Sequence, residues 1–426
     1  MSVHIGQAPD PGQARPPRRL QLDEATALGD RVLEWLCEQR GCGEASAVGA
    51  LRRRHEVFDG IELLVATSAP GDVLSALASA PDVATVVVAG RDRATLTTAD
   101  GARITVHTVP AARYIDALHQ LTGSRAYVRA LGAPGRSGAA SEEELYARLG
   151  LQHVPPELRD GTAAVEAARA GTLPRLIEVA DIRGDLHAHT TASDGEAGIE
   201  EMARAAQARG YAYLAITEHT PAVDAMVDAP IGVDPGRLRE HVAAVREVAG
   251  RLAREGFTLL AGAEVDILPD GSLDYPDDVL EALDWVVASP HVALRQRPAP
   301  VTARMVAAAS HPHVDVIGHP TGRYLIGRRP SAVAPEALVA ACAEHGTFLE
   351  INANPERLDL SARNVRLAHE AGVPIVISTD AHAVGDFANI GYGVSVARRA
   401  WLTAADVVNT RSWSDVQALR KPARRR

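Results

Sequence analysis

Metal-binding side chains recur directly after short apolar segments in the second half of this chain. These segments have the length and the β-branched content of buried strands. Imidazole and carboxylate groups together form a ligand set for zinc, manganese or iron. The nine candidate ligands are His187, His189, Asp194, His219, Glu264, His291, His319, Asp380 and His382. Because one ion takes about four to six ligands, this set predicts a centre with more than one ion.

From about residue 181 the chain alternates apolar runs with amphipathic helical patterns. The apolar runs span 181–189, 211–219, 257–267, 284–291, 314–320, 347–354 and 373–382. Helical spacing of apolar residues occurs between them at 198–210, 237–256, 336–346 and 361–372. Strands that alternate with helices predict a parallel sheet, here a (β/α)7 barrel in an α/β protein.

The position of the candidate ligands links them to one another. Almost every one stands at the carboxyl end of its predicted strand, where α/β barrels gather their catalytic groups. His187 and His189 lie on one face of their strand because side chains alternate with period two, and Asp380 and His382 repeat the arrangement. Closure of the barrel is therefore expected to bring all nine into one pocket.

The remaining histidines of this region are expected to be structural. His241, His345 and His369 lie within helical patterns, which predicts surface or capping roles. His311 and His313 flank a proline ahead of the 314–320 run, and we expect no metal there.

The motifs resemble the polymerase and histidinol phosphatase (PHP) domain, whose signature is HxH, a second His, Glu, two further His and a terminal DxH. The resemblance covers residues 181–410 and includes every expected ligand type. More specifically, this region resembles the PHP domain at the end of bacterial family X DNA polymerases. The strings that carry this resemblance are DIRGDLHAHT, GAEVDILPDGSLD, IGHPTGR, LEINANPERLDLS and VISTDAH. One departure is Glu218, where that group usually has Asp, and neither residue is a ligand.

The resemblance implies three divalent ions of manganese, zinc or iron. By resemblance, one ion takes the predicted catalytic set His187, His189, Glu264 and Asp380. A second shares Glu264 and adds His291 and His319, and a third takes Asp194, His219 and His382. The spacing of the residues alone does not make this division.

Clustered divalent ions predict phosphoester hydrolysis, because they supply hydroxide at neutral pH and neutralise phosphoryl oxygens. Three further residues are predicted to bind substrate. Arg323, in HPTGR, is a candidate for phosphate oxygens, with a solvated loop as the alternative. Asn352 and Asn354 follow the sixth strand, which supplies no ligand, and they either bond substrate or neighbouring ligands or close a turn.

The upstream region, residues 19–180, resembles the palm and a shortened thumb of family X polymerases. GALRRRHEVFDGIELLVATSAP is similar to the palm segment that runs into a strand bearing Asp-x-Asp, and LTGSRAYVRAL is similar to a nucleotide-side segment. Nucleotidyl transfer with two metals needs two carboxylates at i and i+2 and a third on a neighbouring strand. The matching positions hold Gly60, Glu62 and Thr105. Polymerase activity is therefore predicted to be lost.

The chain is expected to divide into five segments. These are a disordered arm at 1–18, the degenerate palm and thumb at 19–160, a linker at 161–180, the PHP domain at 181–410, and a helix with a basic tail at 411–426. The DNA-gripping helix-hairpin-helix region that the resemblance would place ahead of the palm is expected to be missing, because residues 1–18 are too few to form it. Basic runs such as the tail are expected to be solvated surface.

Composition sets limits on partners and location. The net charge of −10 gives no general sign of nucleic-acid binding, and three cysteines make no disulfide framework. Without an apolar stretch long enough to span a bilayer or a signal peptide, the predicted location is the cytoplasm. The sequence leaves the oligomeric state open.

The predicted function is metal-dependent phosphoester hydrolysis, with DNA 3′ ends as the first choice of substrate and 3′-5′ exonuclease chemistry. A small-molecule phosphatase acting on histidinol phosphate or a nucleotide phosphate is the second hypothesis. A non-catalytic DNA-binding or scaffold protein is the third. A DNA-end enzyme should lose affinity steeply as salt rises, whereas a small-molecule phosphatase should not.

Overall fold

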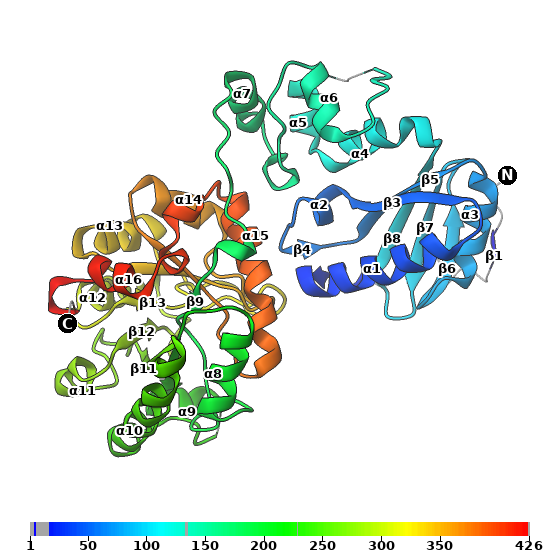
Figure 1. The fold of residues 1–426 in the computed structure, drawn as a ribbon. Helices are drawn as coiled ribbons and strands as arrows, with labels where there is room; N and C mark the ends of the chain where they lie inside the picture. The colour runs from blue at the N-terminus through cyan, green and yellow to red at the C-terminus, as the bar shows by residue number, and fades with distance from the viewer. Residues whose placement is uncertain (1–3, 6–16, 133–134, 228, 425–426) are drawn as a thin grey trace. The chain divides into compact units, whose positions relative to one another are not determined.

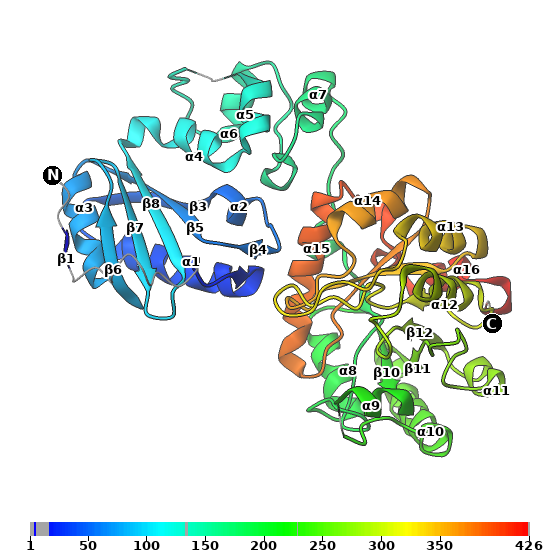
Figure 2. The ribbon, with the colours of Figure 1, turned by 180° about the vertical axis from the view of Figure 1, so that it is seen from behind.

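The computed structural model describes residues 4–5, 17–132, 135–227 and 229–424. The chain divides into two compact units, residues 1–174 and 175–426 (Figures 1 and 2). Most of the predicted arm, 1–18, lies outside the described residues. Within the predicted linker, 161–180, helix α7 (Ala163–Ala170) packs against α5 (Arg125–Leu131). The first unit therefore extends beyond the expected boundary at residue 160.

The first unit contains a mixed sheet of six strands in the order β1-β6-β7-β8-β5-β3. Strands β5 and β8 run parallel, and the other neighbours run antiparallel. The strands are β1 (His4–Ile5), β3 (Cys42–Val48), β5 (Ile61–Thr67), β6 (Val83–Val88), β7 (Arg93–Thr98) and β8 (Arg103–Val109), with β2 (Leu20–Gln21) and β4 (Val57–Phe58) forming a separate pair.

Helices of the first unit bury one apolar face each. The helices besides α5 and α7 are α1 (Leu22–Glu38), α2 (Gly49–Arg52), α3 (Pro70–Ala76), α4 (Tyr114–Thr122) and α6 (Glu142–Arg148). In α1, Leu28, Val32 and Leu36 recur at helical spacing and are buried, and this helix contacts β3 and β5. The pattern of period two in the strands and of three to four in α1 explains the α/β arrangement.

A buried ion network holds α6 to the rest of the first unit. Arg159 is fully buried and donates to Glu142 Oε1, and Arg52 Nη2 lies 2.6 Å from Glu142 Oε2. Burial alone would raise the pKa of Glu142. The charge of Arg159 and hydrogen bonds from both arginines outweigh it and lower this pKa to about 2.

This network predicts acid-sensitive stability in the first unit. Above pH 4.5 the Glu142 carboxylate is ionised in the folded and the unfolded chain, so its pairing contributes fully; as the pH falls toward about 2, the contribution is lost. We expect Glu142→Gln to lower the stability of this unit by roughly 3 kcal/mol at neutral pH, and the gap to close between pH 4.5 and about 2. Hydrogen exchange of peptides from α4 and α6 measures it. Glu143→Gln, on the exposed side of α6, is the control, and a gap independent of pH would contradict the ion-pair account.

The second unit is a nearly closed barrel of seven parallel strands in sequence order. The strands are β9 (Gly184–Asp185), β10 (Tyr213–His219), β11 (Thr258–Asp266), β12 (Trp285–Ser289), β13 (Val316–Ile317), β14 (Phe348–Asn352) and β15 (Ile375–Ser378). A parallel bridge between Ala188 and Ala381 joins the two ends of the sheet, and His189 N donates to Ala381 O over 2.8 Å. The predicted (β/α)7 barrel is confirmed.

Helices surround this barrel (Figures 1 and 2). They are α8 (Ile199–Ala208), α9 (Asp224–Val227), α10 (Pro235–Leu252), α11 (Asp277–Glu281), α12 (Pro298–Ser310), α13 (Pro335–His345), α14 (Ala362–Glu370), α15 (Ile390–Arg399) and α16 (Trp413–Leu419). The core includes Tyr213, Trp285 and Phe348, which begin their strands. Apolar side chains thus fill the amino end of the barrel and leave its carboxyl end to polar groups.

The expectation that the basic tail is solvated is wrong for the described part of the tail. Arg420, Lys421 and Arg424 are buried. Arg420 contacts both carboxylate oxygens of Asp315, at 2.7 and 3.0 Å, and Arg424 Nη2 lies 3.1 Å from Asp315 Oδ2. Asp315 comes just before β13, so the tail is fastened to the barrel by charge-assisted hydrogen bonds that the local sequence pattern does not reveal.

Among the described residues, no helix combines the length and the apolar character that crossing a membrane requires.

Candidate metal centre

Six of the seven barrel strands end at a candidate ligand. His219 closes β10 and Glu264 lies near the end of β11, while the other ligands follow β9, β12, β13 and β15 within a few residues. Asp194 lies farther along the loop that leaves β9. The carboxyl edge of the barrel therefore brings together all nine predicted ligands.

The first group of ligand atoms consists of His187, His189, Glu264 and Asp380, all of them buried. Their ligand atoms lie within 4.8 Å of one another. His189 Nε2 is 3.0 Å from Asp380 Oδ1, and His187 Nε2 is 3.4 Å from Glu264 Oε2. This is the set that the family resemblance implies for one ion.

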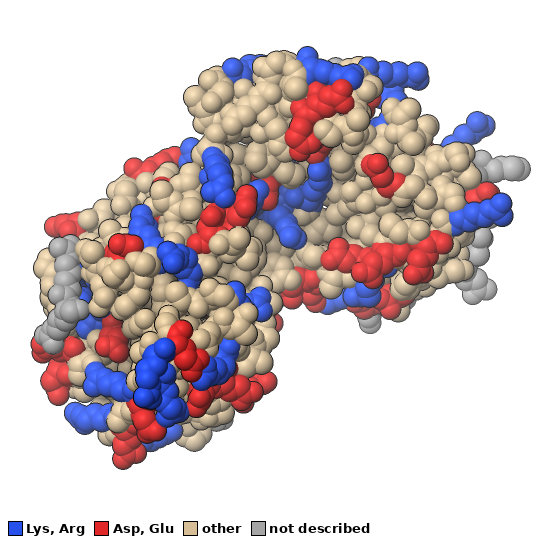
Figure 3. All heavy atoms as spheres, in the orientation of Figure 1, with Lys and Arg blue, Asp and Glu red and all other residues tan. Residues whose placement is uncertain are grey.

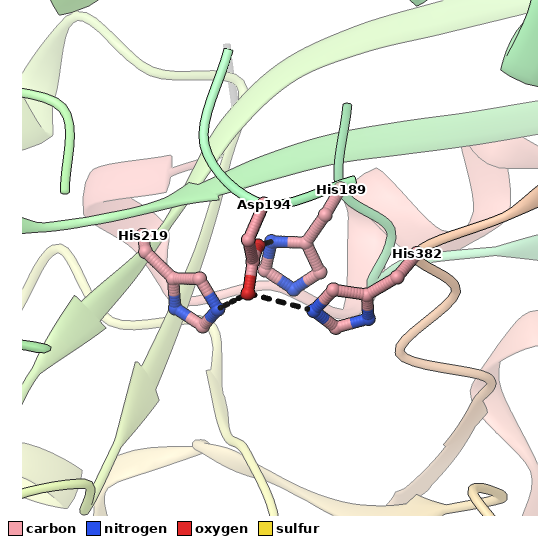
Figure 4. Close-up of side chains that lie close together, drawn as sticks. All are labelled: His189, Asp194, His219 and His382. Carbon is pink, nitrogen blue, oxygen red and sulfur yellow. Dashed lines mark ion pairs between the residues drawn. The ribbon is translucent and has the colours of Figure 1, made fainter. Parts of the chain in front are cut away.

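The second group consists of Asp194, His219, His382 and His189 (Figure 4), and the side chains of Asp194 and His382 are partly exposed. Asp194 Oδ2 is 3.3 Å from His382 Nε2 and 3.5 Å from His219 Nε2. The structure adds His189 to this group, with Nδ1 3.9 Å from Asp194 Oδ1. The His189 ring is stacked between those of His219 and His382, with centroids 4.3 Å away on each side.

The third group gathers around Glu264, with His219 and His291. His319, which the resemblance places here, is 2.7 Å from Glu264 Oε1, and His291 Nε2 is 3.2 Å from the same oxygen. His219 thus stands in two of the groups. One fully buried carboxylate, Glu264, lies among five imidazole rings, so the three groups form one continuous cluster.

The donor chemistry of the cluster fits divalent ions. Polar atoms in protein interiors are nearly always hydrogen-bonded, yet several here have no such partner among the described residues. They are His187 Nε2, His189 Nδ1, His219 Nδ1, His319 Nδ1 and Glu264 Oε2. Burial alone would raise the pKa of Glu264 and of Asp380, but the neighbouring histidines lower both pKa values well below the usual range. Ionised carboxylates attract a cation directly, and each imidazole becomes a ligand when the cation displaces its proton.

Residues around the ligands fix their orientation. Glu350, on β14, lies 2.8 Å from His187 Nδ1, and Asp266, on β11, lies 3.2 Å from His291 Nδ1. With Nδ1 engaged, the Nε2 atom of each ring faces the cluster. Neither carboxylate was predicted from the sequence. For Asp266 the spacing was a usable signal, since it stands two residues after Glu264 and therefore on the same face of the strand.

Glu218 organises the loop that carries Asp194. It accepts hydrogen bonds from Thr190 Oγ1, over 2.5 Å, and from Ser193 Oγ. His241 Nε2 lies 3.2 Å from Glu218 Oε1, and its side chain is only 8% exposed. The expected surface or capping role for His241 is therefore wrong: this helix residue reaches across to the base of the metal-binding loop.

The three predicted substrate-binding residues occupy different environments. Asn352 is fully buried and donates from Nδ2 to Asp380 Oδ2 over 3.0 Å, so it positions a ligand. Asn354 closes a turn, because its Oδ1 accepts from the backbone of Glu356. Arg323 is half-buried and donates to the carbonyl oxygens of Arg357 and Leu358. That contact orders the loop after β14.

The polymerase-like positions in the first unit also lie together. Glu62 on β5 pairs in register with Thr105 on β8, and Gly60 immediately precedes β5. His107 Nε2 lies 3.5 Å from Glu62 Oε2. Of the three positions, only Glu62 carries a carboxylate, whereas a two-metal transferase site needs several.

Comparison with known proteins agrees with both halves of this description. The PHP domain family model matches residues 185–354. The chain is 33% identical over 427 residues to the DNA polymerase/3′-5′ exonuclease PolX of Bacillus subtilis (strain 168), covering 95% of this chain and 73% of that protein. The chain belongs to the PolX family. The predicted resemblance to a PHP domain and to family X polymerases is thereby confirmed.

Other relatives of this PolX-family protein match about half of the chain. A probable phosphatase of Thermoanaerobacter sp. (strain X514) is 29% identical over 240 residues, which cover 53% of this chain and 89% of that protein. A solved structure of a candidate histidinol phosphatase from Listeria monocytogenes is 17% identical, with a TM-score of 0.37, and covers 48% of this chain and 96% of that one.

Proposed function

We propose that this PolX-family protein hydrolyses phosphodiester bonds at DNA 3′ ends, using three divalent ions at the carboxyl edge of its barrel, and that it does not polymerise. The coarser activity, metal-dependent phosphoester hydrolysis, rests on the PHP domain and on the relatives that match it. The observation that carries the proposal is the gathering of nine ligand side chains from six strands into one cluster.

Each part of the cluster has a chemical task. Bound divalent ions lower the pKa of a coordinated water and neutralise charge on a phosphate. Glu264 supplies a negative charge shared by the ion sites, while Glu350 and Asp266 hold the imidazoles that face them. The side chains of Asp194 and His382 are 27% and 32% exposed, against 0% for His187 and Glu264. Substrate therefore approaches from the side of Asp194 and His382.

Two observations favour DNA as the substrate and hydrolysis as the reaction. The similarity to PolX extends over 95% of the chain, including the first unit, and that relative is described as a polymerase and a 3′-5′ exonuclease. Gly60 and Thr105 replace two of the three carboxylates that nucleotidyl transfer needs. The hydrolytic site keeps its full ligand set.

A small-molecule phosphatase is the second candidate. It is favoured by the relatives described as probable phosphatases, which match only 46–53% of this chain. An enzyme that acts on DNA 3′ ends should hydrolyse an oligonucleotide faster than a phosphomonoester at the same concentration. A small-molecule phosphatase should show the reverse preference.

The proposed function predicts that the protein shortens a DNA strand from its 3′ end and does not extend it. With manganese present, we expect the full chain to shorten a 5′-labelled single strand from its 3′ end. Addition of a template and all four nucleoside triphosphates is expected to yield no longer product, because the palm lacks the carboxylates for a second reaction. Denaturing gel electrophoresis measures both. Histidinol phosphate and a 3′-phosphorylated strand are assayed beside it: hydrolysis of histidinol phosphate alone would favour the phosphatase, and an extended product would refute the loss of polymerase activity.

A further inference from the structure

A groove opens between two loops that leave the metal-binding strands. One loop, residues 293–296, follows His291, and the other, residues 327–332, lies in the segment that follows His319. The groove has a volume of about 910 Å³, near the upper end of the range of small-ligand pockets. The segment that leads from His319 to the second loop lies against the first loop, since a Cβ atom added at Gly322 would come within 2.8 Å of Leu294. The groove therefore belongs to the carboxyl edge of the barrel.

The charge of this groove differs from that of the protein as a whole. The chain has a net charge of −10, and on the face drawn in Figure 3 acidic and basic side chains are intermixed. The described residues that line the groove include Arg295, Arg328 and Arg329 and no carboxylate. A concave surface lined by one sign of charge concentrates ligands of the opposite sign.

Two of these arginines are available to a ligand. Arg295 and Arg329 are exposed, and neither forms an ion pair or a side-chain hydrogen bond with another described residue. Most other arginines of the barrel that are named above are engaged, as Arg420 and Arg424 are with Asp315. Unpaired guanidinium groups on a groove wall match the oxygens of phosphate groups.

The third arginine links the groove to the metal centre. The Arg328 guanidinium lies 4.3 Å from the ring centroid of Tyr324, and Arg357 lies 4.5 Å from the same ring. Arg328 also donates from Nε to Gly322 O over 2.9 Å. The buried Arg357 places Nε 3.9 Å from Oδ2 of the ligand Asp380. The contacts from Arg328 through Tyr324 and Arg357 to Asp380 therefore connect the groove wall that carries Arg328 to the cluster.

We propose that the groove binds the phosphate backbone of a single-stranded polynucleotide whose end lies at the metal centre. The inference rests on the proposed function and narrows it: the substrate is a strand several nucleotides long, held by Arg295, Arg328 and Arg329 beyond the reacting phosphate. A small phosphate ester fills the metal centre and leaves the groove empty. Single-strand binding by backbone charge is sequence-tolerant and strongly dependent on salt.

The test separates the groove from the catalytic centre. Arg295→Gln/Arg329→Gln is compared with the control Arg254→Gln/Arg363→Gln, which removes two exposed arginines outside the groove lining. The substrates are a 20-nucleotide single strand and bis(p-nitrophenyl) phosphate. We expect the groove variant to lower the ratio of kcat/KM for the strand to that for the small diester by about tenfold, mainly through KM, and the control to leave it unchanged. The slope of log kcat/KM for the strand against log salt should fall in magnitude by about 1.4, since each contact contributes about 0.7 for single strands.

A second readout keeps the inference independent of catalysis. Fluorescence anisotropy of a labelled single strand, in chelator, measures binding without hydrolysis, and the groove variant should bind about tenfold more weakly than the control. Equal losses on both substrates, or unchanged binding, would overturn the groove assignment. If the wild-type chain hydrolyses neither substrate but binds the strand through the groove, the proposed function fails and the groove proposal stands.

Discussion

Glu264→Gln is expected to lower metal-dependent hydrolysis by about a thousandfold, because the cluster loses the charge that its ion sites share and an ion contributes several kcal/mol to such a reaction. Glu264 is fully buried and lies within 3.6 Å of five imidazole rings, including 2.9 Å to His219 and 2.7 Å to His319. The glutamine keeps the shape of the side chain. Steady-state hydrolysis of the single strand and the metal content of the purified protein measure the two consequences together.

The matched control is Glu344→Gln, which changes an exposed glutamate on α13 of the same barrel. It should retain wild-type activity and metal content. Full metal content in Glu264→Gln with full activity would remove this carboxylate from the mechanism. Full metal content with low activity would show that Glu264 acts on the reacting groups after the ions have bound.

Asp315→Ala is expected to lower the free energy of unfolding of the barrel by about 3–5 kcal/mol, since it leaves Arg420 and Arg424 buried without their carboxylate. Asp315 also accepts from the Val286 backbone over 2.9 Å, so the change removes a link between the start of β13 and β12 as well. Urea unfolding followed by tryptophan fluorescence is a suitable readout. Trp285 and Trp413 have ring centroids 6.2 Å apart, and the Arg420 guanidinium lies within 5.8 Å of both rings.

Asp278→Ala serves as the control for this measurement. Asp278 is 75% exposed and lies 3.8 Å from Arg239, an ion pair at the surface, where such pairs contribute about 0–1 kcal/mol. If Asp315→Ala costs no more than that control, the tail is not held by this carboxylate. The tail would then be held to the barrel by apolar contacts such as those of Val416.

The gathering of the candidate ligands was predictable because each is tied to a local pattern. A short apolar run ending in His219 or Asp380 signals a strand end, and one architectural rule then places all strand ends at the same edge. The same rule placed Asn352 at this edge, but it did not predict that the amide donates a hydrogen bond to Asp380. The division of ligands among ions followed from family resemblance, and the structure differs from it in placing His189 and His219 each in two groups.

The residues that escaped prediction depend on contacts between distant parts of the chain. Glu350 reads as one polar residue within a strand, and only the fold brings it to His187, 163 positions earlier. The tail reads as a basic run, yet Arg420 meets Asp315 from 105 positions away. His241 lies in an ordinary helical pattern whose partner, Glu218, belongs to a strand. Such pairings arise from packing, which local periodicity does not encode.

The candidate metal centre joins residues that follow the first and the last barrel strands. His189 and Asp380 are 191 positions apart and contact each other there. A growing chain therefore contains His187 and His189 long before it contains Asp380, and bringing the two ends together is a long loop closure. Ions that need both ends bind only the finished barrel, so their binding energy adds to its stability. Ions bound at this centre would therefore also hold the first and last strands of the barrel together, and they can do so only after the last strand has been synthesised.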